Sequence, residues 1–118
     1  MKEKKDLRIV FMGTPEFAVG QLDAIIEAGY NVVGVVTVPD RPAGRGKKLT
    51  PSAVKLYAES RNLPVLTPEK LRDEEFLAAL KEWEADLFVV VAFRMLPRVV
   101  WGMPAMGTFN LHASLLPE

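Results

Sequence analysis

The sequence predicts an α/β protein built on an open, doubly wound and mainly parallel sheet. Apolar runs of strand length alternate with longer stretches of helical periodicity, a pattern that is typical of parallel α/β sheets. With 118 residues, of which 49% are hydrophobic and 25% charged, the chain has the size of one domain and can bury a core. No internal repeat, low-complexity segment or domain linker interrupts the pattern.

The first third of the chain predicts a strand, a helix and a second strand. Residues 7–12 form an apolar strand, after which Thr14 can cap a helix and Pro15 suits its first turn. The helix should end at Gly29. Its expected buried face consists of Phe17, Ala18, Leu22, Ile25 and Ile26. Residues 31–38 are rich in valine on both faces, which predicts a strand that is covered on both sides.

The middle of the chain predicts a long loop followed by a helix and a short strand. Residues 39–51 contain several prolines, two glycines and no apolar periodicity, so we expect an exposed loop. Ser52 can cap a helix that runs to about Arg61. Residues 63–66 form a short strand, and the proline within it indicates an edge position.

The last part predicts a main helix and two further strands. A helix start at residues 67–69 precedes this main helix, which we expect at about 73–84. Its expected buried face consists of Phe76, Leu77, Leu80 and Trp83. Residues 86–93 are the strongest strand in the sequence, and a loop or short helix at 96–101 leads to a last strand at 108–113.

Right-handed crossovers would join these strands into a Rossmann-like, open doubly wound sheet with strand order 3-2-1-4-5. In such sheets, ligands bind at the carboxyl ends of the strands where the order reverses. Here that place lies between the first and fourth strands. The fold alone predicts the position of a site and no reaction.

Composition excludes several classes of function. Fifteen basic residues balance fifteen acidic ones, so no global field attracts a nucleic acid or a membrane. Without cysteine, the chain can form neither a disulfide scaffold nor a catalytic thiolate, and with one histidine we expect no metal site. We expect no signal peptide and no membrane span, because the longest apolar run, residues 87–93, is far shorter than the ~20 residues a span needs. These features predict a cytoplasmic protein.

Missing motifs argue against two common ligands. The first turn, Gly13-Thr-Pro-Glu, lacks the glycine spacing of a dinucleotide-binding loop. The sequence also lacks the G-x-x-x-x-G-K-[ST] loop that cradles nucleotide phosphates. Binding of NAD or ATP is therefore not the preferred interpretation.

The last predicted strand carries a row of polar side chains. Alternation along a strand places Asn110, His112 and Ser114 on one side. In the functional interpretation, Asn110 donates a hydrogen bond to a developing oxyanion and His112 manages protons. In the alternative interpretation, these residues form the solvated face of an edge strand. The spacing alone does not decide between the two.

The loop at 39–51 concentrates positive charge. It contains one acid, Asp40, and four bases, which are Arg41, Arg45, Lys47 and Lys48. A projecting basic segment of this kind can bind the phosphates of a nucleic acid. Taken by itself, an ordinary solvated loop is the simpler interpretation.

Three segments of the sequence resemble the methionyl-tRNA formyltransferase family. The opening RIVFMGTPEFAVGQLDAI is similar to the start of that family, and the basic loop VVTVPDRPAGRGKKLTPSAVK is its most specific mark. The end, FNLHASLLP, matches the Asn-x-His-x-Ser-Leu-Leu-Pro motif of folate-dependent formyltransferases. The likeness covers essentially the whole chain.

The resemblance implies transfer of a formyl group from 10-formyltetrahydrofolate to the amino group of methionyl initiator tRNA, a step in translation initiation. It assigns catalysis to Asn110 and His112, whose hydrogen bonds would stabilise the oxyanion. It places the folate against Phe93, Arg94, Met95 and Leu96 and against Ser114, Leu115, Leu116 and Pro117. It places the tRNA against Arg41, Arg45, Lys47 and Lys48, with Arg41 in the most specific role.

The sequence departs from the family in two places. Many members have Tyr-Gly at the position of Phe93-Arg94, with one more residue before the Leu-Pro, so we expect a differently shaped folate loop. Family members also continue beyond Glu118, through a catalytic aspartate and a tRNA-binding barrel. Residues 1–118 are therefore expected to be the amino-terminal part of the catalytic domain. Without the aspartate that pairs with His112, we expect negligible activity.

Three further expectations concern partners and alternatives. The strand at 108–113 would be an exposed edge, which favours self-association. The chain could instead belong to a formyltransferase for another amine, such as a nucleotide sugar or glycinamide ribonucleotide. The basic loop argues against that alternative, because a small acceptor needs no contact with tRNA phosphates. A fragment that binds folate or tRNA without catalysis is the other alternative.

Overall fold

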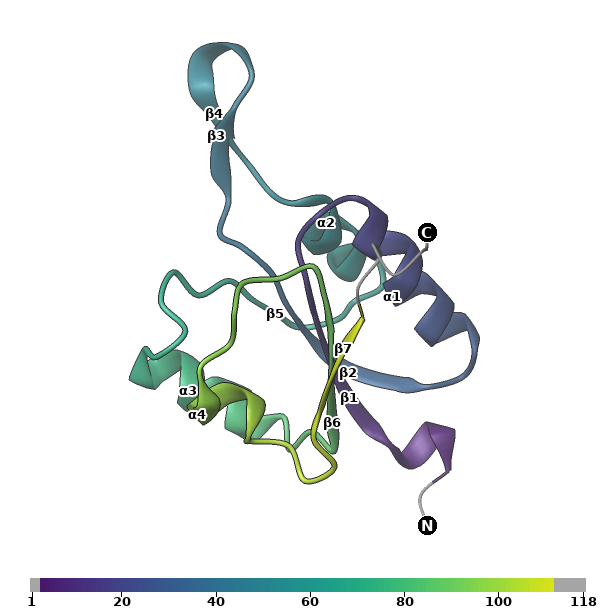
Figure 1. Ribbon diagram of the computed structural model, residues 1–118. Coiled ribbons are helices and arrows are strands. Elements are labelled where there is room, and N and C mark those ends of the chain that lie inside the picture. The colour runs from purple at the N-terminus through teal and green to yellow at the C-terminus, as the bar shows by residue number, and fades with distance from the viewer. Residues whose placement is uncertain (1–2, 112–118) are drawn as a thin grey trace, which may run out of the picture.

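A computed structural model of the chain describes residues 3–111, in which a parallel sheet lies between two layers of helices (Figure 1). Its strands are β1 (Arg8–Gly13), β2 (Asn31–Val36), β5 (Val65–Leu66), β6 (Leu87–Val91) and β7 (Thr108–Leu111). Their spatial order is β5-β2-β1-β6-β7, and every pairing between them is parallel. The predicted order 3-2-1-4-5 is confirmed, as are the edge positions of the third and fifth strands.

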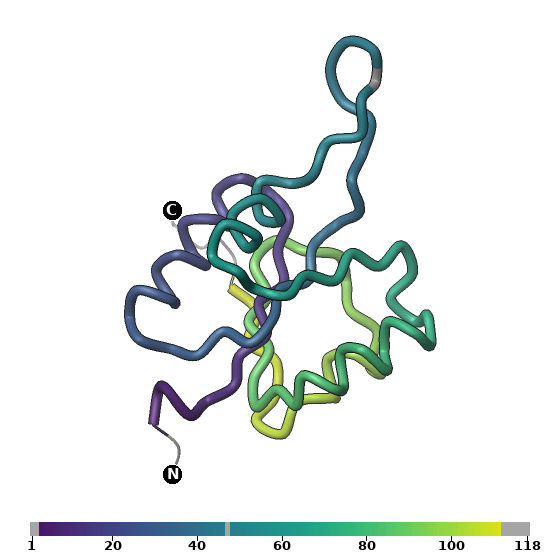
Figure 2. The backbone as a smooth tube through the Cα atoms, turned by 180° about the vertical axis from the view of Figure 1, so that it is seen from behind, coloured from purple at the N-terminus to yellow at the C-terminus, as the bar shows by residue number. Residues whose placement is uncertain are grey.

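Helices cover both faces of the sheet (Figures 1 and 2). Helices α1 (Phe17–Glu27) and α2 (Ala53–Ser60) pack on one face, and α3 (Glu74–Glu82) and α4 (Arg98–Trp101) pack on the other. A short 3₁₀ turn, η1 (Lys4–Asp6), precedes β1. Within residues 3–111, no helix has the length and apolar character needed to cross a membrane.

The core follows from the alternation of side chains along β1. Phe11 points into the cluster that includes Ala18 and Leu22 of α1, whereas Met12 points into the cluster that includes Leu80 of α3. All five of these side chains are 0–1% exposed. Because both faces of β1 are covered, every position along it can be apolar, which accounts for its uninterrupted hydrophobic run.

Two of the predicted helix starts are confirmed by their capping hydrogen bonds. The Ser52 hydroxyl accepts from the Lys55 amide at 3.1 Å, and the Asp73 carboxylate accepts from the Phe76 amide at 3.0 Å. Each bond satisfies an amide that has no partner inside its helix. Helices α2 and α3 therefore begin at about the residues that the sequence predicts.

Two other predicted starts are wrong. Thr14 does not cap α1, because a tight turn comes first, in which the Ala18 amide donates to the Pro15 carbonyl at 2.9 Å. Phe17 at the helix start is consequently 48% exposed rather than buried. No helix begins at residues 67–69, where the carbonyls of Pro68 and Glu69 accept from the Arg94 side chain.

The segment predicted as a loop is a β-hairpin that projects from the body in both views (Figures 1 and 2). Strands β3 (Arg41–Ala43) and β4 (Lys48–Thr50) pair antiparallel, and the turn between them includes the 3₁₀ segment η2 (Arg45–Lys47). The turn is possible because Gly44 and Gly46 have φ of +70° and +80°. The prediction of exposure was right and the prediction of irregular structure was wrong.

Candidate functional site

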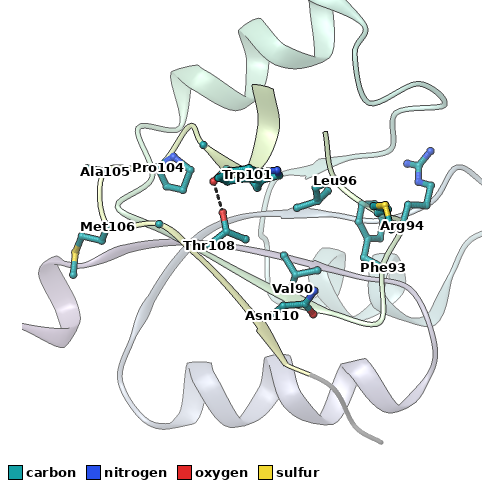
Figure 3. Close-up of a pocket in the computed structure, with 13 residues that line it drawn as sticks. Val90, Phe93, Arg94, Leu96, Trp101, Pro104, Ala105, Met106, Thr108 and Asn110 are labelled. Atoms are coloured by element: carbon teal, nitrogen blue, oxygen red, sulfur yellow. Dashed lines mark hydrogen bonds between the residues drawn. The ribbon is translucent and has the colours of Figure 1, made fainter. Parts of the chain in front are cut away.

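A pocket of about 850 Å³ opens between the segment that follows β6 and the segment that leads into β7 (Figure 3). The residues that line it include Phe93, Arg94, Met95 and Leu96, as well as Asn110. The predicted folate-contacting loop and one predicted catalytic residue are thus brought together. A cavity of this size can hold a small organic molecule.

Asn110 reaches the pocket through the register of β7. Val90 of β6 lies opposite Asn110, and both line the pocket together with Thr108 (Figure 3). Leu111 packs against the core cluster on the other side of the sheet. The expected alternation holds for these positions. Asn110 is exposed, as expected for the solvated face of an edge strand.

The rim of the pocket was not predicted. Trp101, Pro104 and Met106 line it, and the Thr108 hydroxyl donates to the Trp101 carbonyl at 2.7 Å (Figure 3). Trp101 is 47% exposed, Met106 61% and Met95 93%. The dense run of large apolar residues at 93–106 is the signal in the sequence that could have indicated this surface.

The chain leaves β6 through a left-handed residue. Ala92 has φ +48°, a conformation that is uncommon for a residue with a side chain and that is concentrated at functional sites. The next residue is Phe93, and the Cζ atom of Arg94 lies 5.0 Å from the centroid of its ring. This turn directs residues 93–96 away from the sheet and over the pocket.

Arg94 fastens this segment to the connection between β5 and α3. Its guanidinium donates to the Pro68 carbonyl at 2.7 Å and to the Glu69 carbonyl at 2.9 Å. Its Nε is buried and has no hydrogen-bond partner in the described part of the chain. Burial, and secondarily the charge of Arg41, lowers the pKa of Arg94.

A second pocket, of about 640 Å³, lies at the base of the hairpin and at the carboxyl ends of β1 and β6. Arg41 and Arg94 both line it, together with Thr14, Thr50 and Ser52. Its position between the first and fourth strands of the sheet is the crevice that the topology predicted. Arg94 also lines the larger pocket and therefore belongs to both.

The other predicted basic residues lie farther along the hairpin. Arg45 and Lys48 are exposed, and Lys48 lies opposite Ala43 near the turn. At the base, the Lys55 ammonium donates to the Asp40 carboxylate at 2.9 Å, which raises the pKa of Lys55. The one acid of the segment is thus engaged by α2, and among the described side chains Arg41, Arg45 and Lys48 of the hairpin form no ion pair.

Several predicted site residues fall outside the described residues. They are His112, Ser114, Leu115, Leu116 and Pro117. Lys47 belongs to η2, and its backbone lies in the turn of the hairpin. Over residues 3–111, no three histidine or carboxylate side chains gather in a way that could hold a metal ion.

The chain is similar in sequence to proteins named methionyl-tRNA formyltransferase. A relative from Bacteroides fragilis is 67% identical over 116 residues, and one from Parabacteroides distasonis is 68% identical over 117 residues. Each alignment covers 98% of this chain and 36% of the relative. The chain thus spans about a third of the length of the curated relatives it matches.

A solved structure supports the fold. Phosphoribosylglycinamide formyltransferase from Streptococcus pneumoniae TIGR4 superposes with a TM-score of 0.63 at 16% identity, covering 95% of this chain and 59% of that protein. The family described as formyl transferase matches residues 7–118. That match extends over nearly the whole sequence, and it shows that the chain belongs to the formyl transferase family.

Proposed function

We propose that this chain contributes to a methionyl-tRNA formyltransferase, which transfers a formyl group from 10-formyltetrahydrofolate to the amino group of methionyl initiator tRNA. The relatives that carry this name are 67–68% identical to the chain. In this proposal, residues 1–118 are the amino-terminal part of the catalytic domain, and the protein acts in the cytoplasm.

The observation that carries the proposal is the pocket shared by Asn110 and residues 93–96. Phe93, Leu96 and Trp101 supply apolar surfaces that suit the ring system of a folate. The backbone groups of residues 92–97 can read the polar edge of the pterin. The amide of Asn110 lies in the same pocket, beside the place where the reactive end of the donor would be.

The reaction requires a polarised formyl group and the transfer of one proton. The amine of the methionyl group attacks the formyl carbon, a new C–N bond forms, and the bond to the folate nitrogen breaks. The Asn110 amide donates a hydrogen bond to the oxyanion that develops on the formyl oxygen. His112, two residues farther along the sequence, passes the proton lost by the amine towards the departing folate nitrogen.

The hairpin is the proposed contact for the acceptor RNA. Its bases are Arg41, Arg45, Lys47 and Lys48, and its acid Asp40 is paired with Lys55. Lysine and arginine side chains bind RNA phosphates by displacing counterions. The hairpin projects from the sheet, so it can reach an acceptor stem while the donor occupies the larger pocket (Figure 1).

The experiment measures formyl transfer to methionyl initiator tRNA from 10-formyltetrahydrofolate by two proteins. One is the 118-residue chain, and the other is a chimera in which residues 1–118 replace the matching segment of the Bacteroides fragilis relative. Each is assayed as the wild type and with Asn110→Ala or His112→Ala. We expect activity only in the chimera, and a loss of at least about 100-fold in kcat for each substitution.

Two results would contradict the proposal. If the chimera transfers formyl groups to glycinamide ribonucleotide or to a nucleotide sugar and not to the tRNA, the chain belongs to a formyltransferase for another amine. A chimera that binds folate and tRNA without any transfer would make it a binding segment. Phe109→Ala, a substitution in β7 at a side chain that is 56% exposed, serves as the control for the strand itself.

Within residues 3–111, β7 is an edge strand of the sheet, and this position gives a further expectation. Unpaired strand edges favour association between chains. We propose that the 118-residue chain self-associates through this edge, and sedimentation velocity tests it. A single monomeric species across the concentration range would contradict this expectation.

A further inference from the structure

Arg41 and Arg94 are brought to one pocket from distant parts of the sequence. Arg41 begins the hairpin and Arg94 follows β6, and both line the pocket at the base of the hairpin. None of the residues that line this pocket is acidic, and within residues 3–111 neither arginine forms an ion pair. Two like charges have thus been placed together without a protein counterion.

Arg94 retains hydrogen-bonding capacity. A guanidinium has five N–H donors, and two of them are used on the carbonyls of Pro68 and Glu69. The buried Nε donates to no group in the described part of the chain. A buried donor without an acceptor is costly, and a hydrogen bond from this guanidinium to an anion would offset part of that cost. Anchoring the loop therefore leaves N–H donors of Arg94 that are not used.

The remaining lining of the pocket also suits an anion. Thr14 and Thr50 contribute hydroxyl groups at its wall. Ser52, which caps α2, lies at the same wall, so the positive end of that helix is near the pocket. The Thr50 hydroxyl donates to the Lys48 carbonyl at 3.1 Å, so the pocket combines two guanidinium groups, the hydroxyl of Thr14 and a helix terminus.

We propose that Arg41 and Arg94 form one phosphate site, and that it takes a backbone phosphate of the RNA acceptor. The identity of the phosphate as part of an RNA rests on the proposed function, whereas the site itself rests on the pocket. Arg94 is therefore a substrate ligand in addition to an anchor for the folate loop. An RNA phosphate reaches this position because Arg41 lies where the basic hairpin joins the sheet.

The first test is a titration of the 118-residue chain with inorganic phosphate at constant ionic strength, followed by NMR of the arginine Nε–H groups. We expect the signals of Arg41 and Arg94 to shift together with one dissociation constant. Arg41→Met and Arg94→Met should each weaken phosphate binding about tenfold or more. Arg72→Met, an exposed arginine outside this pocket, should leave it unchanged.

Arg94→Lys separates ligation from anchoring. Lysine keeps the charge and loses the planar fork that spans two carbonyls. If Arg94 binds phosphate, the lysine variant retains more phosphate affinity than the methionine variant. Equal affinity in the two variants, or an Nε signal of Arg94 that does not move while that of Arg41 does, overturns the proposal. Arg41 is exposed, so its variant reports binding even if changes at Arg94 disturb the fold.

A second titration identifies the source of the phosphate. The chimera and its Arg94→Met variant are titrated with an acceptor-stem RNA, with inorganic phosphate as competitor. We expect the variant to bind the RNA more weakly and phosphate to compete only with the wild type. Phosphate binding with no effect of Arg94 on RNA affinity overturns the RNA assignment. A chimera that binds phosphate and transfers no formyl group refutes the proposed function and leaves the site intact.

Discussion

The central strands and the hairpin differ in what holds them in place. Phe11 and Met12 of β1 are 0% exposed, and helices cover both faces of their sheet. In the hairpin, every residue of β3 and β4 is exposed. Burial of apolar surface is the dominant favourable term in folding. The sheet and the helices packed on it therefore contribute most of the free energy of unfolding. The hairpin is free to carry like charges because it contributes little to that free energy.

The largest expected effect comes from truncating a core side chain of β1. Phe11→Ala should lower the free energy of unfolding by about 3–5 kcal/mol, because it removes a large buried ring and leaves a cavity. Phe109→Ala removes the same atoms from a side chain that is 56% exposed, and should cost less than about 1 kcal/mol. Urea denaturation measures both. Equal losses would show that burial does not distinguish these sites.

The next effect concerns a glycine of β2. A Cβ at Gly34 would lie 2.5 Å from the ring of Trp83, so Gly34→Ala should destabilise the protein by about 1–3 kcal/mol. Gly20, within α1, has no other group within 4 Å of the place that a Cβ would take, and Gly20→Ala should stabilise by up to about 1 kcal/mol. Thermal unfolding compares the two. A stabilising Gly34→Ala would mean that the Trp83 ring moves away without cost.

A smaller effect is expected between helices α1 and α2. The Tyr57 hydroxyl donates to the Asp23 carboxylate at 2.6 Å, and burial together with this bond raises the pKa of Tyr57 above its ordinary value. The resulting stability is fully present below pH about 10 and is lost as pH rises through the raised pKa. Tyr57→Phe should cost about 1 kcal/mol at neutral pH.

The pH dependence isolates that contribution. The difference in unfolding free energy between the wild type and Tyr57→Phe should shrink above pH 10, and denaturant titrations from pH 7 to 11 measure it. The pKa of Lys55 is also raised, and that contribution cancels in the difference because both proteins contain Lys55. A constant difference over this range would show that Tyr57 does not titrate against Asp23.

The smallest effect is expected in the hairpin. Leu49 is 67% exposed, and Leu49→Ala should change the free energy of unfolding by less than about 0.5 kcal/mol. Leu22→Ala, at a side chain that is 0% exposed, is the matched substitution in the core and should cost about 2–5 kcal/mol. Chemical denaturation again provides the comparison. A large loss at Leu49 would show that the hairpin is packed against something.

The sequence predicted the fold well where local chemistry and burial agree. Apolar runs revealed the strands, and Ser52 marked the start of α2 through a cap that the structure contains. Prediction failed where contacts with residues far away in the sequence determine the local structure. Pro68 and Glu69 have the local features of a helix start, but their carbonyls accept from Arg94, which lies 26 and 25 residues farther along the chain, respectively. Local propensity carries no information about such a competitor.

The candidate site was predicted in part for a similar reason. Alternation along β7 placed Asn110 on the pocket side, and the resemblance indicated residues 93–96. The rim formed by Trp101 and Met106 depends on how the turn around α4 folds back. The neighbouring positions of Arg41 and Arg94 depend on the whole sheet topology, since 53 positions separate them in the sequence. Neither arrangement can be predicted from a local sequence pattern.

The pairing of Arg41 with Thr50 has a consequence for protein engineering and for evolution. The hairpin leaves and re-enters the body at adjacent points, so removing it would require a bridge of only a few residues. Segments with neighbouring ends are the places where proteins accept insertions and deletions. By this reasoning the hairpin can be lengthened, shortened or exchanged while the fold beneath it is inherited intact.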